Sequence, residues 1–377
     1  MNAGWKKTLT LGLFAFLVAL MGIMGLLEIA FRMYPPSGTF DSGITWDPGL
    51  GYRLRPYSEV IYNKRNGYVR NTTNRYGWVD VDHEEQKAGL VFRVGFFGDS
   101  YVESVMVPAE RHFYRNLPTR ISDAAMEYIG LGMSGFGTVH SYLNSQKWMD
   151  FYDLDLIVYV FVNNDIGDNI SWIKQKKNRP YAVKIFVEPG FAVEWDDYSP
   201  PNPDPSRLEE TISVVRTGSM LFRVIDSRIT LLEKRFAGPQ DNEKLFEGKT
   251  LKIPNQNAPP SEWPEEIKLY AQEVAFSVLK QWSQEVREDG KQFAVLYVPK
   301  GFEVSEETSE RDSFKEWLMD SCAQLEIPLL DPTEALLAES KRGRPVYNDH
   351  WTVAGHEAVG KFLGQWLNCE GLGEREK

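Results

Sequence analysis

The segment Val91-Phe92-Arg93-Val94-Gly95-Phe96-Phe97-Gly98-Asp99-Ser100 decides the fold class. Its first seven residues form a compact apolar run, which is typical of a buried strand, and a sharp glycine-led turn follows at Gly98. In α/β proteins, ligands and reactive groups lie at the carboxyl ends of such strands. Gly, Asp and Ser are also the commonest turn residues, so the tripeptide alone does not assign a nucleophile.

Strands and helices are predicted to alternate from residue 91 onward. We expect strands at 92–97, 126–130, 155–162, 292–298 and 327–331. Amphipathic helices are expected between and after them, at 109–124, 138–151, 263–288, 308–324 and 352–367. Apolar strands that alternate with amphipathic helices predict an α/β protein whose parallel sheet is covered on both faces.

Composition and charge limit the class of protein. The chain has 377 residues, 42 % of them hydrophobic and 13 % aromatic, which supports one large domain with an insertion, or two domains. Acidic residues number 53 against 42 basic ones, and a formal net charge of −11 argues against a nucleic-acid partner. Cys322 and Cys369 have no neighbouring Cys or His at metal-ligand spacing, so we expect no metal site. Whether the two cysteines pair stays open.

An uncharged apolar stretch lies near the start of the sequence. It runs from Thr8 to Leu27, and about 20 apolar residues are enough to span a bilayer. Lys6 and Lys7 precede it, so the positive-inside rule predicts a cytoplasmic N-terminus and an extracytoplasmic remainder. We interpret residues 1–33 as a cytoplasmic N-terminus followed by a transmembrane signal anchor. A cleaved signal peptide is the alternative, although no small-residue cleavage motif follows the stretch.

The rest of the chain divides into three parts by composition. Residues 34–90 are rich in Gly, Pro, Tyr, Asn and Arg, and we expect a lead-in arm with short strands near 59–62 and 67–70. Residues 91–171 and 263–377 carry the alternating α/β pattern. Residues 172–262 contain a proline cluster at 199–205 and are interpreted as an insertion, either a lid or a solvated spacer.

Three later segments place polar or glycine residues at the ends of predicted elements. The glycine-dense turn at 130–138 brings Gly135 to a position where its N–H can approach a substrate oxygen. Asn164 follows the strand at 155–162, where its carboxamide can donate to an oxyanion or cap a turn. The segment 347–356 sets His350 beside Asp349, a pairing that yields a general base near neutral pH.

Together these segments resemble the SGNH/GDSL hydrolase superfamily, from about residue 45 to the end with an interruption at 172–262. The matching blocks are Gly98-Asp99-Ser100, Gly132-Met133-Ser134-Gly135, Asn164-Asp165, and Asp349-His350-Trp351 with Gly355-His356, and the lead-in at 71–77 is similar to that of membrane-associated members. The resemblance implies a flavodoxin-like three-layer α/β/α sandwich, and we expect no cofactor. It implies that Ser100 is the nucleophile and His350 the general base. The implied oxyanion hole consists of the N–H groups of Ser100 and Gly135 and the carboxamide of Asn164.

The carboxylate of the implied catalytic triad departs from the family pattern. The family's aspartate stands two or three residues before the histidine, where this chain has Asn348 and Tyr347. Three arrangements stay open: Asp349 orients His350, a Ser-His dyad works with a backbone carbonyl, or His356 takes part.

The resemblance implies a serine-dependent acyl-ester hydrolase or O-acyltransferase in residues 91–171 and 263–377. The predicted anchor makes an extracytoplasmic envelope glycan or lipid ester the expected substrate. A catalytically degenerate relative that binds glycan in the same cleft is the alternative.

Overall fold

The computed structural model describes residues 3–36, 39–41, 43–64, 67–87, 89–174, 179–184, 191–195, 207, 218–236, 243–246, 249–252, 262–301, 303–304 and 313–369. The proline cluster at 199–205 lies outside these ranges. The chain divides into two compact units. Unit 1 comprises Met1–Asp41, Ile61–Tyr68 and Asn202–Gln240, and unit 2 comprises Ser42–Val60, Val69–Pro201 and Asp241–Lys377.

Unit 1 is built around two helices, α1 (Ala3–Met33) and α7 (Met220–Phe236). Strand β1 (Thr39–Asp41) pairs antiparallel with β4 (Glu59–Lys64), which pairs in turn with β5 (Gly67–Thr72), so the short strands predicted near 59–62 and 67–70 are confirmed. Within α1, the stretch Thr8–Met33 is long and apolar enough to cross a membrane, and it is not buried inside the structure. A signal sequence has the same properties, so the anchor stays a proposal.

A six-stranded sheet in unit 2 confirms the predicted α/β class. Its strands are β6 (Val91–Gly98), β7 (Arg120–Ile121), β8 (Ala124–Gly132), β9 (Leu156–Phe161), β14 (Gln292–Tyr297) and β15 (Leu329–Leu330), in the spatial order β15-β14-β9-β6-β8-β7. All of them run parallel except the short edge strand β7. Without β7, the strands follow the order 2-1-3-4-5 of flavodoxin-like folds, whose ligand crevice opens where the order reverses beside the first strand.

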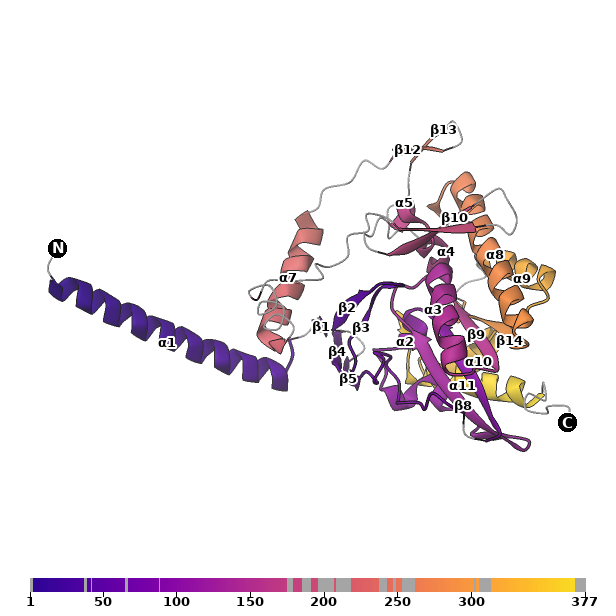
Figure 1. Ribbon diagram of the computed structural model, residues 1–377, viewed down its shortest axis with the longest axis horizontal. Coiled ribbons are helices and arrows are strands. Elements are labelled where there is room, and N and C mark those ends of the chain that lie inside the picture. Colours follow the sequence, from indigo (N-terminus) through magenta and orange to yellow (C-terminus); the bar gives the residue numbers. More distant parts are fainter. Residues whose placement is uncertain are drawn as a thin grey trace. The chain divides into compact units, whose positions relative to one another are not determined.

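Helices cover both faces of this sheet and complete three layers (Figure 1). The first face carries α3 (Thr138–Phe151) and α8 (Glu265–Glu288), and Trp282 of α8 packs edge-on against Phe97 with ring centroids 6.2 Å apart. The second face carries α11 (Val353–Cys369), whose Val359 and Leu363 belong to the same buried cluster as Phe96. Because neighbouring strand residues point to opposite faces, a continuous apolar run such as 91–97 supplies both cores.

The remaining elements are short pairs of strands and smaller helices. The antiparallel pairs are β2 (Ile44–Asp47) with β3 (Gly51–Leu54), β10 (Pro180–Lys184) with β11 (Phe191–Trp195), β12 (Glu243–Phe246) with β13 (Lys249–Lys252), and β16 (Tyr347–Asn348) with β17 (His350–Trp351). The helices are α2 (Ser100–Glu103), α4 (Asn164–Asp168), α5 (Ser171–Lys174), α9 (Ser313–Gln324) and α10 (Thr333–Lys341).

The helix predicted at 109–124 is wrong. Residues Ala109–Arg111 and Phe113–Arg115 form two separate 3₁₀ turns, and β7 follows them. Pro118 cannot supply the N–H that a continuous helix needs at that position. The adjacent side chains of Phe113 and Tyr114 are both fully buried, which an amphipathic surface helix would not allow.

The cysteine question that the sequence left open has an answer in the structure. Cys322 is a buried free thiol and Cys369 an exposed one. They therefore do not pair.

Candidate active site

Strand β6 ends in the turn that carries Ser100. The Asp99 carboxylate accepts a hydrogen bond from the N–H of Tyr101 at 3.0 Å, which caps α2 and makes Ser100 the first helical residue. Ser100 Oγ lies 2.7 Å from Nε2 of His350, although 250 positions separate the two residues in sequence. Both side chains are partly accessible, whereas Asp99 and Tyr101 are buried. The Ser100–His350 pair thus has the geometry of a nucleophile and its base.

His350 is positioned by the hairpin β16–β17, in which Asn348 pairs with His350 and Asp349 occupies the tip with a φ of 67°. The Tyr101 ring lies against the His350 ring, with centroids 4.8 Å apart. The Tyr101 hydroxyl donates to the Asp349 carbonyl at 3.4 Å. Because Tyr101 follows Ser100 directly, its contacts tie the hairpin tip to the nucleophile turn.

Asp349 lies beside the imidazole but does not hold it with a hydrogen bond. Its Oδ2 is 3.4 Å from Nδ1 of His350, a distance within ion-pair range. The Nδ1 atom is buried and has no hydrogen-bond partner within the described part of the chain. The Asp349 side chain is 81 % exposed, so water screens its charge. Its role in orienting His350 therefore stays a prediction.

His356 has a packing role in the first turn of α11. Its ring is buried, and Nδ1 accepts a hydrogen bond from the N–H of Phe113 at 3.1 Å. The ring also stacks on His112, with centroids 5.7 Å apart. Burial, together with the neighbouring His112, lowers the pKa of His356 well below its usual value. A neutral ring engaged in this way is not arranged to exchange protons with Ser100.

The turn after β8 lies against the turn after β6. Gly98 and Gly132 are register partners, and a Cβ at Gly132 would come within 2.3 Å of the Val102 side chain. Gly135 has a φ of 80°, which favours glycine, and its carbonyl accepts a hydrogen bond from Nη2 of the buried Arg179 at 2.7 Å. The Gly135 N–H has no acceptor among the described residues and so remains available to a ligand.

Asn164 reaches the same edge from the end of β9. Its side chain is exposed, and its Nδ2 lies 3.4 Å from Asp99 Oδ2 and 3.2 Å from Asp168 Oδ2. The amide hydrogens are therefore shared with two buried carboxylates in this state. Burial raises the pKa of Asp99, whose Oδ2 also lies 3.3 Å from Ser100 Oγ. The oxyanion role of Asn164 stays a prediction.

Glu103 is a buried carboxyl group behind the Gly135 turn that the sequence did not single out. It accepts hydrogen bonds from both the N–H (3.1 Å) and the hydroxyl of Ser134. Burial raises the pKa of Glu103 to about 7, and the two bonds from Ser134 act in the opposite direction. Since Ser134 precedes Gly135, the Glu103 carboxyl fixes the turn that presents the Gly135 N–H.

Replacing Glu103 by glutamine should flatten the pH dependence of stability. A carboxyl whose pKa rises from 4.5 to about 7 on folding stabilises the fold fully below pH 4.5, and that contribution is lost as pH rises through 7. For this group the loss is on the order of 3 kcal/mol. Chemical unfolding at pH 5 and pH 8 measures it, and Glu103→Gln should lose less stability than the parent. Equal losses in both proteins would contradict the raised pKa of Glu103.

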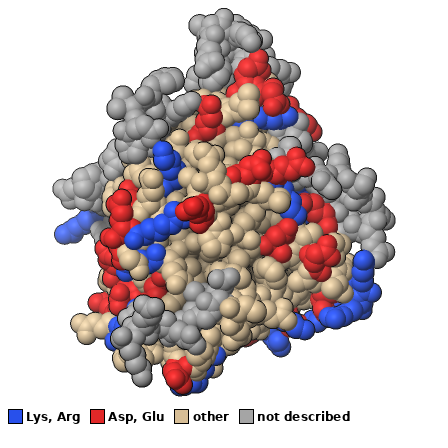
Figure 2. All heavy atoms as spheres, turned by 90° about the vertical axis from the view of Figure 1, so that its right-hand side faces the viewer, with Lys and Arg blue, Asp and Glu red and all other residues tan. Residues whose placement is uncertain are grey.

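On the face that Figure 2 shows, Lys and Arg side chains lie among Asp and Glu side chains around the rim, and a large central area carries neither. Within the described ranges, no group of three or more His, Cys, Asp or Glu side chains is arranged to hold a metal ion.

Comparison with known proteins gives distant structural likenesses. No protein-family model and no curated protein matches the sequence. Among similar solved structures, the acetyl xylan esterase AlAXEase has 10% identity and a TM-score of 0.38, and the match covers 73% of this chain and 100% of that chain. TesA has 10% identity and a TM-score of 0.37, and the match covers 74% of this chain and 98% of that chain. Axe2, an acetylxylan esterase from Geobacillus stearothermophilus, has 11% identity and a TM-score of 0.39, and the match covers 77% of this chain and 100% of that chain. Likenesses this distant do not assign an activity.

The four sequence blocks at Ser100, Gly135, Asn164 and His350 meet at one edge of the sheet, beside the carboxyl ends of β6, β8 and β9. The chain thus has the flavodoxin-like fold that its resemblance to the SGNH/GDSL hydrolases implies, with the blocks of that resemblance gathered around Ser100.

Proposed function

We propose that this chain is a serine-dependent acyl-ester hydrolase or O-acyltransferase of the SGNH type. The observation that carries the proposal is the 2.7 Å contact between Ser100 Oγ and His350 Nε2 at the carboxyl edge of the sheet. The N–H of Gly135, which has no acceptor among the described residues, and the exposed amide of Asn164 at the same edge of the sheet support an oxyanion site.

In the first half-reaction, Ser100 Oγ attacks the ester carbonyl carbon while His350 Nε2 takes the hydroxyl proton. The carbonyl oxygen becomes an oxyanion, which the N–H groups of Ser100 and Gly135 and the Asn164 amide stabilise. The tetrahedral intermediate then collapses: the bond to the leaving alcohol breaks, and His350 returns the proton to that alcohol. The acyl group remains on Ser100 as an ester.

In the second half-reaction, His350 removes a proton from an acceptor that attacks the acyl carbonyl carbon. The bond from that carbon to Ser100 Oγ then breaks, and His350 returns the proton to Ser100. Water as the acceptor gives an esterase, and a sugar hydroxyl gives an O-acyltransferase. We infer an extracytoplasmic site, because Lys6 and Lys7 precede the apolar stretch of α1. An envelope glycan or lipid ester is the substrate class that fits this location.

A substrate panel tests the proposal and separates its two forms. The full-length protein would be given activated esters of increasing acyl length, with and without a saccharide acceptor. Release of the free acid without acceptor indicates an esterase, and an acylated saccharide at the expense of the acid indicates a transferase. If neither product forms with well-folded protein on any ester, the enzymatic proposal fails.

Replacing Asn164 by alanine should lower kcat by roughly 10²–10³-fold, the loss expected when one oxyanion donor is removed. Steady-state rates on the best ester of the panel measure this effect. Asn163→Ala is the matched control, because the neighbouring Asn163 is buried whereas Asn164 is exposed. Unchanged turnover of Asn164→Ala would exclude the oxyanion role.

A glycan-binding protein without catalysis is the second candidate. The unpartnered Nδ1 of His350 and the exposed carboxylate of Asp349 favour it, because a general base is usually oriented through that nitrogen. Saccharide binding that persists without turnover, and that is unchanged in Ser100→Ala, would support this candidate over the enzyme.

A further inference from the structure

Helix α7 exposes a stripe of large apolar side chains. Phe222, Ile225, Ile229 and Leu232 are 38 %, 45 %, 48 % and 51 % exposed. Their spacing of three, four and three residues puts them on one face of the helix. A different face of α7 already packs inside unit 1, where Met220 and Val224 are buried with Ile61 and Phe31. The exposed stripe is therefore a second apolar face of α7, distinct from the face that packs into the core of unit 1.

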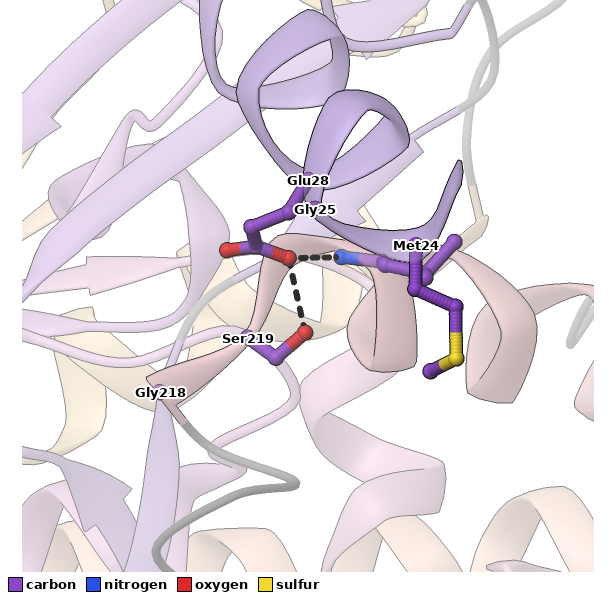
Figure 3. Close-up of a pocket in the computed structure, with 6 residues that line it drawn as sticks. Met24, Gly25, Glu28, Gly218 and Ser219 are labelled. Atoms are coloured by element: carbon purple, nitrogen blue, oxygen red, sulfur yellow. Dashed lines mark hydrogen bonds between the residues drawn. The ribbon is translucent and has the colours of Figure 1, made fainter. Parts of the chain in front are cut away.

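The first turn of α7 is fixed to α1 by a charged residue near the end of the candidate membrane span. Glu28 accepts hydrogen bonds from Ser219 Oγ (2.7 Å) and from the N–H groups of Met220 and Leu221 (both 2.9 Å), as Figure 3 shows in part. Arg32 donates to Glu28 at 2.7 Å and to the Gly218 carbonyl at 2.5 Å. Free N–H groups at a helix start need such acceptors, so this contact fixes where α7 begins.

The position of Glu28 along α1 determines how deep in the proposed membrane this contact between α1 and α7 lies. Glu28 is the first charged residue after the uncharged stretch from Thr8 to Leu27. About 20 apolar residues cross the ~30 Å hydrocarbon core. In the proposed anchor, Glu28 and the start of α7 therefore lie where the hydrocarbon meets the lipid headgroups.

An open hollow lies at this junction. It has a volume of about 380 Å³ and is lined by Met24, Gly25, Glu28, Gly218, Ser219 and Leu221 (Figure 3). The polar groups of Glu28 and Ser219 are already bonded to each other. The surface left to an occupant is mainly apolar, which suits an acyl chain better than water.

We propose that α7 is an interfacial helix, whose stripe of Phe222, Ile225, Ile229 and Leu232 inserts into a phospholipid bilayer beside α1. Between Met220 and Phe236 the sequence holds four basic residues and two acidic ones, although the whole chain has a net charge of −11. A helix that exposes an apolar face and carries an excess of basic side chains lies in the membrane interface, with its exposed apolar face about 5–10 Å deep. This inference rests on the proposed membrane anchor and not on the ester chemistry.

Site-specific fluorescence tests the proposal on the full chain reconstituted in phospholipid nanodiscs. Cys369→Ser is the parent, since Cys322 is buried and its pKa is raised to about 12 by that burial. An environment-sensitive label goes on Ile225→Cys or on Ile229→Cys, both of which are exposed positions. Met319→Cys, on the exposed surface of α9, is the matched control, and Leu17→Cys reports on the anchor itself.

Labels at 225 and 229 should shift their emission to the blue and lose fluorescence to lipids that carry a nitroxide near the headgroup, whereas the label at 319 should not. Water-like emission with quenching by iodide at 225 and 229 would overturn the proposal. Shielding from both quenchers would also overturn it, in favour of a protein partner such as a second copy. If lipid nitroxide quenches the label at 319 as strongly as the labels at 225 and 229, the lipid contact is unspecific and the proposal is also overturned. If nitroxide at the middle of the bilayer quenches the label at Leu17, and the labels at 225 and 229 are not quenched by lipid nitroxide, the proposed anchor stands. Only the proposal that α7 is an interfacial helix then fails.

Discussion

Ser100→Ala is expected to lower kcat for ester turnover by on the order of 10⁶-fold, as removal of the serine nucleophile does in subtilisin. The variant loses the hydroxyl that lies 2.7 Å from His350 Nε2 and that our proposal assigns to the acyl-enzyme. Residual catalysis of about 10³–10⁴ over water would come from the oxyanion site and substrate binding. Turnover on the best ester of the panel, with folding checked by circular dichroism, measures the loss.

Ser134→Ala is the control for this prediction, because Ser134 stands in the neighbouring turn and donates to Glu103 rather than to a histidine. We expect a far smaller loss, caused by the altered turn before Gly135. If the two variants lose activity equally, or if Ser100→Ala keeps its turnover, Ser100 is not the nucleophile.

His350→Ala should lose kcat to a similar extent, on the order of 10⁶-fold, since nucleophile and base act as one unit. The double variant with Ser100→Ala should lose no more than either single variant. Such non-additivity separates a shared chemical step from two independent structural effects, and the measurement is kcat for the two single variants and the double variant on one ester.

Asp349→Asn is the matched test of the third triad position. Its exposed carboxylate at 3.4 Å from Nδ1 is expected to contribute less than roughly tenfold to kcat, as exposed charge pairs do. We expect the Tyr101 ring, whose centroid lies 4.8 Å from that of the imidazole, to orient His350 instead. A loss as large as that of His350→Ala would show that Asp349 orients the base after all.

Much of the fold followed from the sequence because its central strands are apolar on both faces. The predicted strands 92–97, 155–162 and 292–298 correspond to β6, β9 and β14, and such apolar runs are typical of strands that are buried between two helical layers. The helix at 109–124 failed for the opposite reason. In that segment the neighbouring residues Phe113 and Tyr114 are both buried by tertiary packing, and their spacing does not follow the period of a helix. Helix α10 was not expected at all, since only Leu336 within it is buried.

The site was predictable where residue type and strand end coincide. Ser100, Gly135 and Asn164 each follow a strand of the sheet, so the sequence order alone places them at one edge. The supporting groups were not predictable in this way. Glu103 stands in a segment without periodicity, and Arg179 is 44 residues from the Gly135 carbonyl that it binds. Their roles depend on tertiary packing, which no local pattern records.

Covalent labelling by a fluorophosphonate tests the central claim most directly. The probe reacts with a serine only where a neighbouring base activates it and donors stabilise the resulting oxyanion. We predict one modification on the full-length protein, mapped by mass spectrometry to the peptide that contains Ser100 and absent from both Ser100→Ala and His350→Ala. A folded protein that stays unlabelled, or one that is labelled at another serine, would contradict the assignment of Ser100 and His350 as the reactive pair.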